Sequence, residues 1–310
     1  MRAVFFGTPE IAVPSLEALA EVAEIVAVVC QPDRPAGRGL ALKAPPVKQR
    51  AEQLGLPVAQ PAKVRTPEFA AWMAGLQADV GLVIAYGRIL PKAVLEAPRR
   101  GCINLHASIL PKYRGAAPIT WAVVNGEAET GVSLMQMDEG MDTGPVLTIH
   151  RIPIGADLTA DELAVAIGAL AAQVVREDLA RAVRGEIEAT PQDHAAASAA
   201  PMLEKEHGRI PWEKRARQVH DHVRGMTSWP GAFTKVDGKL LKVLGTRVAD
   251  EAGAEAAPGT IVAADRGHVR VACGEGAIEI LRAQVEGRKA LPAADLVAGR
   301  TLREGTVLGG

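Results

Sequence analysis

Residues 80–85 read VGLVIA, a run without one polar side chain. A strand with one wet face alternates polar and apolar residues, so a continuous apolar run indicates a strand that is buried on both faces of its sheet. β-rich stretches occur near residues 2–6, 24–30, 79–85, 101–105 and 131–137, and helical patterns separate or follow them near residues 14–22, 46–54, 66–76, 90–97, 117–125 and 159–184. This alternation predicts an α/β fold over residues 1–185, with a parallel sheet and helices on its faces.

The pattern changes after Gly185. Residues 186–208 lack periodicity and are rich in Ala, Pro and Ser, which is typical of a linker between domains. A short helix is expected near residues 211–225, followed by short strands that turn residues separate. About five strands within residues 209–310 predict a small all-β domain, a compact barrel of the OB-like kind.

The composition gives no sign of a disordered chain. Apolar residues make up 48% of the 310 residues and charged residues 23%, as in an ordinary globular protein. The formal net charge of -1 gives no sign of a polyanionic partner for the whole chain. Residues 209–310, however, carry 16 Lys and Arg against 12 Asp and Glu. An acidic partner would be drawn to this C-terminal third or to a local patch elsewhere.

The cysteines and the first residues of the chain indicate the cellular compartment in which the protein works. Cys30, Cys102 and Cys273 lie far apart and form no C-x-x-C pair, so neither a disulfide framework nor a metal site is expected. The first apolar run is broken by Gly7 and Pro9, too soon for a signal peptide, and no run reaches the length of a membrane span. We therefore expect a cytoplasmic protein that makes no membrane contact, and we take it to be a monomer.

The turn at residues 5–10, FFGTPE, joins a strand to a helix, where an open α/β sheet places a ligand-binding loop. A dinucleotide fingerprint needs G-x-G-x-x-G, whereas Gly7 is followed by Pro9 and no second glycine. A tight turn beside a binding crevice is therefore expected rather than a nicotinamide site.

A second loop is basic. Residues 31–50, QPDRPAGRGLALKAPPVKQR, hold one acidic residue, Asp33, against five basic ones, which are Arg34, Arg38, Lys43, Lys48 and Arg50. The loop is either a solvated surface feature or an arm that contacts the phosphates of a nucleic acid. The sequence leaves both interpretations open.

Residues 103–118, INLHASILPKYRGAAP, bring polar groups to the end of an expected strand. Asn104 and His106 lie two residues apart, so in extended backbone both side chains point to the same face, toward the crevice at the carboxyl end of the sheet. An amide and an imidazole can both donate hydrogen bonds to an oxyanion, and the imidazole can carry a proton. The alternative is a structural histidine. Ser108 lacks the G-x-S-x-G elbow of a nucleophile.

A carboxylate follows the next strand. The stretch MDEGMDTG, residues 137–144, holds Asp138 and Asp142 in a Gly-rich turn. Either could cap the turn, and either could approach His106, favour its charged form and take a proton from an attacking amine. Spacing alone does not choose between them.

Three further residues receive simpler interpretations. His220 and His222, in the expected helix near 211–225, are taken as a solvated face rather than a metal site. Trp229, with Pro230, is expected to be a core residue beside a turn.

These stretches together resemble the methionyl-tRNA formyltransferase family over almost the whole chain. The matching segments are FFGTPE at 5, QPDRPAGRG at 31, VIAYGRILP at 83, GCINLHASILPKYRGAAPI at 101, ETGVSLMQMDEGMDTG at 129, SWPGAF at 228 and PGTI at 258. The resemblance implies a Rossmann-like catalytic domain and an OB-like tRNA-binding domain. It also implies transfer of a formyl group from 10-formyltetrahydrofolate to the amino group of methionine on initiator methionyl-tRNA.

The resemblance assigns roles to residues. It implies Asn104, His106 and Asp142 as the catalytic residues, so it selects Asp142 over Asp138. It implies a folate-contacting segment at Ser108, Ile109, Leu110 and Pro111, with Tyr86 and Gly87 bordering the same pocket. It implies that the basic loop, with Arg38 and Lys43, reaches the acceptor end of the tRNA. Two positions depart from the family pattern, Ile11 for a common Phe and Ile109 for the usual Leu, and both stay apolar.

Rival functions share some of these features. A formyltransferase for an amino sugar nucleotide or another small amine, or a hydrolase that sends the formyl group to water, could use the same Asn, His and Asp. A non-catalytic RNA-binding or folate-binding module is the alternative from another class.

Overall fold

The computed structural model describes residues 1–36, 41–250, 256–265 and 268–309. Their contacts divide the chain into two compact units. The N-terminal unit is made of Met1–Pro118, Glu129–Ile152 and Ala164–Pro201. The C-terminal unit is made of Ile119–Ala128, Pro153–Leu163 and Met202–Gly310. The expected domain boundaries, a catalytic domain at 1–185, a linker at 186–208 and a C-terminal domain at 209–310, stay a prediction.

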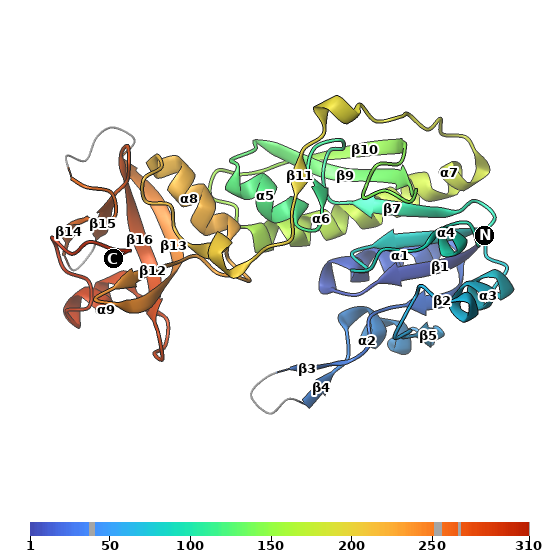
Figure 1. The fold of residues 1–310 in the computed structure, drawn as a ribbon, viewed down its shortest axis with the longest axis horizontal. Helices are drawn as coiled ribbons and strands as arrows, with labels where there is room; N and C mark the ends of the chain where they lie inside the picture. The colour runs from blue at the N-terminus through green and yellow to red at the C-terminus, as the bar shows by residue number, and fades with distance from the viewer. Residues whose placement is uncertain (37–40, 251–255, 266–267, 310) are drawn as a thin grey trace. The chain divides into compact units, whose positions relative to one another are not determined.

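The N-terminal unit contains a seven-stranded sheet with the strand order β10-β9-β7-β6-β1-β2-β5 (Figure 1). The strands are β1 (Arg2–Gly7), β2 (Glu24–Val29), β5 (Val58–Ala59), β6 (Val80–Ile84), β7 (Cys102–His106), β9 (Glu129–Gln136) and β10 (Val146–Pro153). Neighbours from β5 to β7 are parallel, which confirms the α/β fold. All five residues of β6 are buried, as its continuous apolar run indicated.

The sequence indicated neither the strands β5 and β10 nor the direction of β9. β9 lies antiparallel to β7, with Asn104 opposite Met135 and His106 opposite Ser133. β9 therefore begins at the edge of the sheet where β7 ends, whereas a parallel strand would begin at the opposite edge. As a result, the loop that follows β7 and the strand β9 both lie beside the candidate polar residues.

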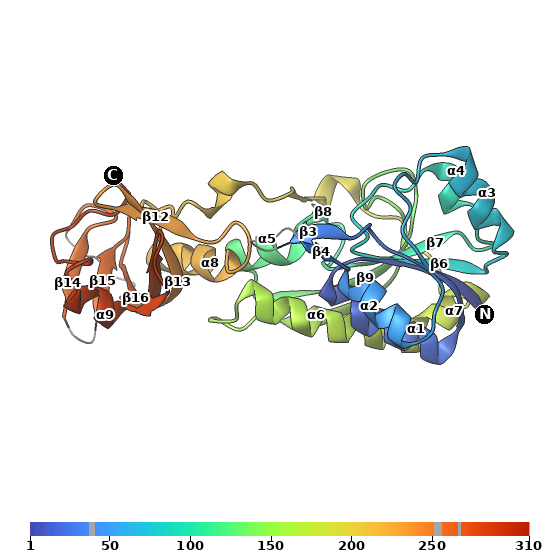
Figure 2. The same ribbon diagram turned by 90° about the horizontal axis from the view of Figure 1, so that it is seen from below.

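Helices cover both faces of this sheet, as Figure 2 shows for α3 and α4 on one face and α1, α6 and α7 on the other. Their bounds are α1 (Val13–Val22), α2 (Pro46–Gln53), α3 (Pro67–Gly75), α4 (Lys92–Leu95), α6 (Ala160–Val174) and α7 (Ala180–Arg184). The expected long helix near 159–184 is present as α6, a π-helical turn at Val175–Leu179, and α7, which ends at Gly185 with φ +76°. Burial of apolar side chains from strands, α3 and α4 forms one core cluster.

The strand order reverses at β1, which has β2 on one side and β6 on the other. In open α/β sheets, a crevice for ligands forms at the carboxyl ends of the strands beside such a reversal. The turn after Gly7 lies at the carboxyl end of β1, and His106 ends β7 two strands away.

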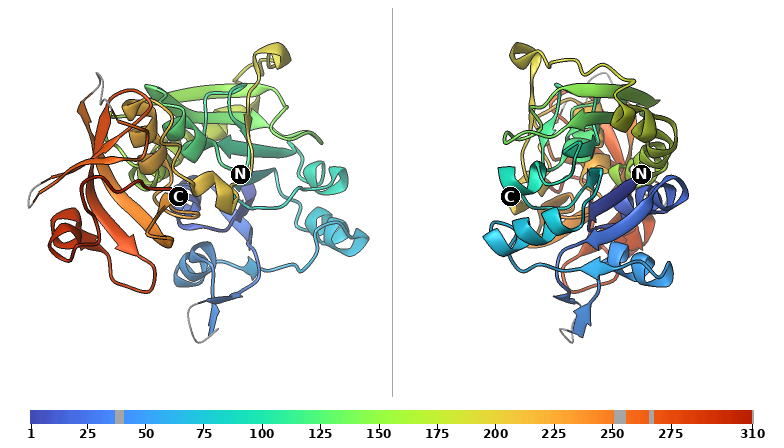
Figure 3. Two further views of the ribbon diagram at one scale, coloured as in Figure 1. Left: turned by 60° about the vertical axis from the view of Figure 1, so that its left-hand side comes forward. Right: turned by 90° about the vertical axis from the view of Figure 1, so that its right-hand side faces the viewer.

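Two short pairs of strands lie outside the main sheet. β3 (Arg34–Ala36) and β4 (Ala41–Lys43) form an antiparallel pair, which projects from the unit in both views of Figure 3. β8 (Arg114–Gly115) pairs in parallel with β11 (Ala199–Ala200). In the second pair, β11 comes from the expected linker and β8 from the loop after β7.

The C-terminal unit is built on an antiparallel sheet with the order β12-β13-β16-β15-β14, and β17 pairs with β16. Its strands are β12 (Phe233–Val236), β13 (Lys239–Asp250), β14 (Ile261–Ala264), β15 (Val269–Ala272), β16 (Ala277–Val285) and β17 (Leu291–Pro292). The register between β13 and β16 shifts at three places, and such bulges increase the twist and bend of strands. The OB-like interpretation is confirmed as a curled antiparallel half-barrel.

Helices complete the C-terminal unit: α8 (Ala216–Gly225) and α9 (Ala293–Ala298) pack on the sheet, and α5 (Pro118–Val124) belongs to the same unit from Ile119 on. The core includes Trp212, Val219 and Val223 with strand residues such as Leu241 and Ile278. Within the described residues, no helix has the length and apolar character needed to cross a membrane.

Two expectations for this unit were wrong. His220 and His222 are not on a solvated face, because they are 2% and 8% exposed. One face of α8 packs on β13, and Arg224 and Asp221 on the same helix meet residues of the segments 153–163 and 119–128. Trp229 is not a core residue, because it is 62% exposed. A single helix or turn does not reveal in its sequence which distant segments will cover it.

Candidate active site

Asn104 and His106 lie on the same side of β7, as their spacing predicted. They are 8% and 5% exposed, so both polar side chains are almost fully withdrawn from solvent. β6 and β9 flank β7, which fixes the backbone of both residues by ladder hydrogen bonds. Buried polar groups need partners, and their partners define the site.

Asp142 lies between these two side chains. Asn104 Nδ2 donates a hydrogen bond to Asp142 Oδ1 over 3.3 Å, and His106 Nδ1 is 3.5 Å from the same oxygen. The second oxygen, Oδ2, accepts a hydrogen bond from the Gly115 backbone N–H at 2.9 Å. Asn104, His106 and Gly115 therefore meet at one carboxylate, that of Asp142, which lies 38 positions after Asn104 in the chain.

Asp138 has a different position. Its Oδ1 accepts hydrogen bonds from Gly140 N at 3.0 Å and from Thr143 Oγ1 at 2.7 Å. These contacts close the turn in which the residue itself lies. Of the two carboxylates that spacing left open, it is Asp142 that reaches His106.

The other ring nitrogen of His106 fixes its protonation pattern. His106 Nε2 lies 2.8 Å from the carbonyl oxygen of Tyr113. A carbonyl oxygen can only accept, so Nε2 must carry the proton and donate it, and Nδ1 is the nitrogen that can gain or lose a proton. When Nδ1 is protonated as well, its N–H faces the Asp142 carboxylate. The ring is thus oriented by one acceptor and can hold a positive charge beside another.

The expected folate-contacting segment, residues 108–111, alternates between buried and partly exposed side chains. Ser108 is fully buried, and its hydroxyl donates to Lys112 O at 2.7 Å. Leu110 is 4% exposed and packs with Met135 and Val146. Ile109 and Pro111 keep part of their surface exposed. Contact of this segment with a ligand stays a prediction that now rests on Ile109, Pro111 and the backbone.

Tyr86 and Gly87 follow β6. The Tyr86 side chain is buried, packs edge to face on Phe6 with ring centroids 5.4 Å apart, and has its pKa raised to about 12 by burial. Its carbonyl oxygen accepts hydrogen bonds from Thr8 Oγ1 and Gln31 Nε2. These bonds join the FFGTPE turn to the chain after β6. Gly87 has φ +80°, which favours glycine.

Two of the basic residues in the loop at 31–50 form ion pairs with acidic residues of the same unit. Lys48 pairs with Asp33 at 2.8 Å and Arg50 pairs with Glu17 at 2.6 Å, so these two cations have partners inside the unit. Lys43 ends β4 and is exposed. Arg38 lies outside the described residues.

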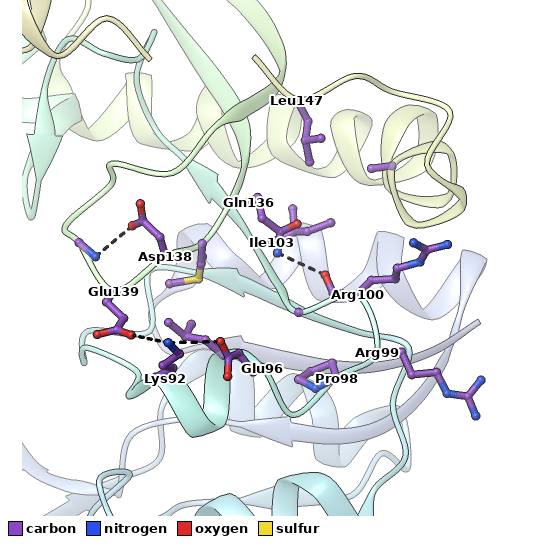
Figure 4. Close-up of a pocket in the computed structure, with 15 residues that line it drawn as sticks. Lys92, Glu96, Pro98, Arg99, Arg100, Ile103, Gln136, Asp138, Glu139 and Leu147 are labelled. Carbon is purple, nitrogen blue, oxygen red and sulfur yellow. Dashed lines mark hydrogen bonds and ion pairs between the residues drawn. The ribbon is translucent and has the colours of Figure 1, made fainter. Parts of the chain in front are cut away.

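A cavity of about 920 Å³ lies in the same unit, beside the residues at the beginning of β7 (Figure 4). On one side, Lys92 Nζ lies 3.8 Å from Glu96 Oε1 and 3.5 Å from Glu139 Oε1, as the dashed lines show. Its lining includes Ile103 and Gln136 but none of the three residues that meet at the Asp142 carboxylate. Among the described residues, no three His, Cys, Asp or Glu side chains gather to hold a metal ion.

The sequence reasoning missed two parts of the site. The carbonyl of Tyr113 binds His106, but a backbone carbonyl has no signature in sequence. Gln192 Nε2 donates to Asp142 O at 3.0 Å, although the residue lies in the expected linker. The absence of periodicity there concealed this contact, because a segment that packs through single polar side chains has no repeating pattern.

Comparisons with known proteins show the family of the chain. The family model for formyl transferase matches residues 1–178, and the model for the formyl transferase C-terminal domain matches residues 202–301. A protein of Sorangium cellulosum named methionyl-tRNA formyltransferase is 74% identical over 310 residues, with all of both chains covered. One of the same name from Citrifermentans bemidjiense is 50% identical, over 100% of this chain and 96% of that one.

The fold also has solved neighbours. An N-formyltransferase from Helicobacter canadensis, solved with folinic acid and dTDP-3-aminofucose, has a TM-score of 0.67 at 18% identity. The match covers 90% of this chain and 98% of that one, and at this identity it bears on the fold alone. From the two family models and the full-length relatives, the chain belongs to the methionyl-tRNA formyltransferase family.

Proposed function

We propose that this chain transfers the formyl group of 10-formyltetrahydrofolate to the amino group of methionine on initiator methionyl-tRNA, a step in the initiation of translation. The observation that carries the proposal is the Asp142 carboxylate, which contacts both Asn104 and His106 at the end of β7. The 74% identity to a full-length relative named for this reaction supports it. Folinic acid in the Helicobacter canadensis neighbour supports the folate class of donor.

In the proposed reaction, the neutral amine of methionine attacks the formyl carbon and forms a C–N bond. The carbonyl electrons move to the oxygen, which becomes a tetrahedral oxyanion. Asn104 Nδ2 donates one of its two N–H groups to Asp142 Oδ1, so the other can be donated to the substrate oxygen, and the N–H of a protonated His106 Nδ1, 3.5 Å from Asp142 Oδ1, is shared between the carboxylate and that oxygen. Donors fixed in a site with little water stabilise such an oxyanion strongly.

Two proton transfers complete the reaction. Asp142 takes the proton that the amine loses, and the bond between the formyl carbon and N10 of the folate breaks. N10 receives a proton from the Nδ1 side of His106, because Nε2 is held by Tyr113 O. The proton that Asp142 has taken then passes to His106 Nδ1, 3.5 Å away, which restores both residues, and the proposed reaction uses no metal.

The substrates are assigned to different parts of the chain. We place the folate along Ile109, Pro111 and the backbone from Ser108 to Leu110, near Tyr86 and Gly87. We place the tRNA acceptor end near Lys43 and Arg38, and other parts of the tRNA on residues 209–310, where cationic side chains outnumber acidic ones. A cytoplasmic monomer with a catalytic domain at 1–185 and a linker at 186–208 belongs to the same proposal.

The experiment offers the purified chain 10-formyltetrahydrofolate with methionyl-tRNA, with free methionine and with an amino sugar nucleotide in parallel. Formylation of methionyl-tRNA is expected, with little product from the two small amines. Preferential formylation of the sugar amine would overturn the proposal in favour of a sugar formyltransferase. Release of formate without an acceptor would indicate a hydrolase, and no loss of the donor at all would indicate a binding module.

A further inference from the structure

The segment Thr190–Ala200, called the return segment below, is fastened to the N-terminal unit at both of its ends. At one end, Thr190 and Val146 exchange two backbone hydrogen bonds of 2.8 Å. At the other end, β11 pairs with β8, so that Ala199 and Ala200 lie beside Arg114 and Gly115. Figure 1 shows the chain between α7 and β11 passing back along the unit. Both attachments adjoin residues of the candidate active site.

Gln192 is the buried polar residue of this segment, with 8% of its surface exposed. Its Nε2 donates to two carbonyl oxygens, Asp142 O at 3.0 Å and Gly144 O at 2.7 Å. Its Oε1 accepts from Arg114 Nη2 at 2.7 Å and from Arg114 Nε at 3.1 Å. Both ends of the amide are therefore used, and both connect to segments that contact the Asp142 carboxylate or its backbone.

The backbone of Asp142 needs such support. Its φ is +55°, in the left-handed region where a Cβ crowds the following carbonyl oxygen. A conformation of this kind persists only where the surroundings hold it. Gln192 binds the carbonyls of Asp142 and Gly144, which lie on either side of Thr143. Gln192 therefore fixes the turn at Asp142, the residue with the left-handed backbone.

The return segment also holds the other partner of the carboxylate. Gly115 N donates to Asp142 Oδ2, and Gly115 has φ +124° with no room for a side chain, because a Cβ would lie 2.6 Å from Ala200 O. Ser198 accepts from Tyr113 N through its hydroxyl and from Arg114 N through its carbonyl. The residue whose carbonyl binds His106 is thus fixed by the same segment.

We propose that Gln192 is a positioning residue for the reaction: it holds the turn at residues 142–144 so that the Asp142 carboxylate stays between Asn104 and His106. The return segment is then a working part of the active site. This inference rests on the proposed function for its kinetic consequence, whereas its structural consequence stands without it.

The test uses the full chain with Gln192→Ala, Gln192→Glu, Asp142→Asn and the two double variants. Gln192→Glu keeps the length of the side chain and an oxygen for Arg114 but lacks the two N–H donors. Both single variants are expected to lower kcat by about 10- to 100-fold, the scale of a displacement of about 1 Å, with KM for both substrates unchanged. In the Asp142→Asn background, neither should lower kcat further, because Gln192 acts through Asp142.

A matched control is Gln173→Ala, which removes an exposed glutamine of the same unit whose amide donates to Glu177. This variant is expected to keep the wild-type kcat. Melting temperatures of all variants separate a loss of positioning from a loss of folded protein. If Gln192→Ala does not fold, Gln192→Glu supplies the same comparison.

A second measurement is independent of activity. Amide hydrogen exchange in residues 137–145 is expected to be faster in both Gln192 variants than in the wild type and the Gln173→Ala control. Wild-type kcat in Gln192→Glu, an undiminished effect in the Asp142→Asn background, or unchanged exchange in residues 137–145 would each overturn the inference. If the wild type does not formylate methionyl-tRNA, the proposed function fails, and the exchange measurement still decides the role of Gln192.

Discussion

His106 Nε2 donates to the carbonyl oxygen of Tyr113 across 2.8 Å, and this bond decides which nitrogen of the ring faces the Asp142 carboxylate. Because Nε2 is engaged with an oxygen that can only accept, a proton taken up by the ring goes to Nδ1. The ring can then carry a charge beside Asp142 without turning. This arrangement has kinetic consequences at Asn104 and Asp142, the two residues whose side chains meet beside the ring.

Replacing the amide donor should affect the chemical step. Asn104→Ala is expected to lower kcat for formylation by about 100- to 1,000-fold, the typical loss of one oxyanion donor. Folate binding, measured by calorimetry, should stay measurable. The exposed Asn125, changed to Ala, is the control for loss of an asparagine. A kcat near that of the wild type in Asn104→Ala would remove the amide from the mechanism.

The two aspartates of the turn should behave differently. Asp142→Asn is expected to lower kcat by at least about 100-fold, because a proton acceptor is lost while the shape is kept. Asp138→Asn alters only contacts within the turn, so its effect on kcat should be much smaller. Both variants are compared by single-turnover formylation. Equal losses would mean that the turn, and not the Asp142 carboxylate, matters.

The loop cations should act on tRNA alone. Lys43→Ala and Arg38→Ala are expected to raise KM for methionyl-tRNA, to leave KM for the folate unchanged and to reduce the salt dependence by about one ion each. Lys63→Ala, at another exposed position of the same unit, is the control. Steady-state kinetics at several salt concentrations supply the slopes. An unaltered slope would return the loop to a solvated surface feature.

The buried His222 should make the folded state sensitive to acid. Burial lowers its pKa from the ordinary 6.5 to about 4, so below pH 6.5 the unfolded chain takes up this proton before the folded chain does. Stability contributed by the neutral ring is present above pH 6.5 and decreases as the pH falls toward 4, by about 3 kcal/mol in total.

The variant His222→Leu removes this ionisation and places an apolar side chain at the buried site. Its free energy of unfolding, measured with urea, should therefore depend less on pH between 6.5 and 4 than that of the wild type. His194→Leu, at an exposed position, should keep the wild-type pH dependence. The same pH dependence in His222→Leu and the wild type would show that the ring does not couple to folding.

Much of the fold could be predicted because its signals are local. The apolar run of β6 reported burial on both faces, and alternation of strands and helices reported an α/β unit. The pairing of β9 with β7 had no local signal, since direction depends on where the chain goes between them. For the same reason, the burial of His220 and the exposure of Trp229 were predicted wrongly.

The sequence by itself determined that Asn104 and His106 share a face, because side chains in a strand alternate with a period of two. Through the family resemblance, it also indicated Asp142 rather than Asp138 as the catalytic carboxylate. Only the tertiary structure decided that Asp142 contacts both residues, that Tyr113 O selects the reactive nitrogen, and that Gln192 holds the turn. Those contacts join segments far apart in the chain, and their geometry arises only when the sheet, the turn and the return segment pack together.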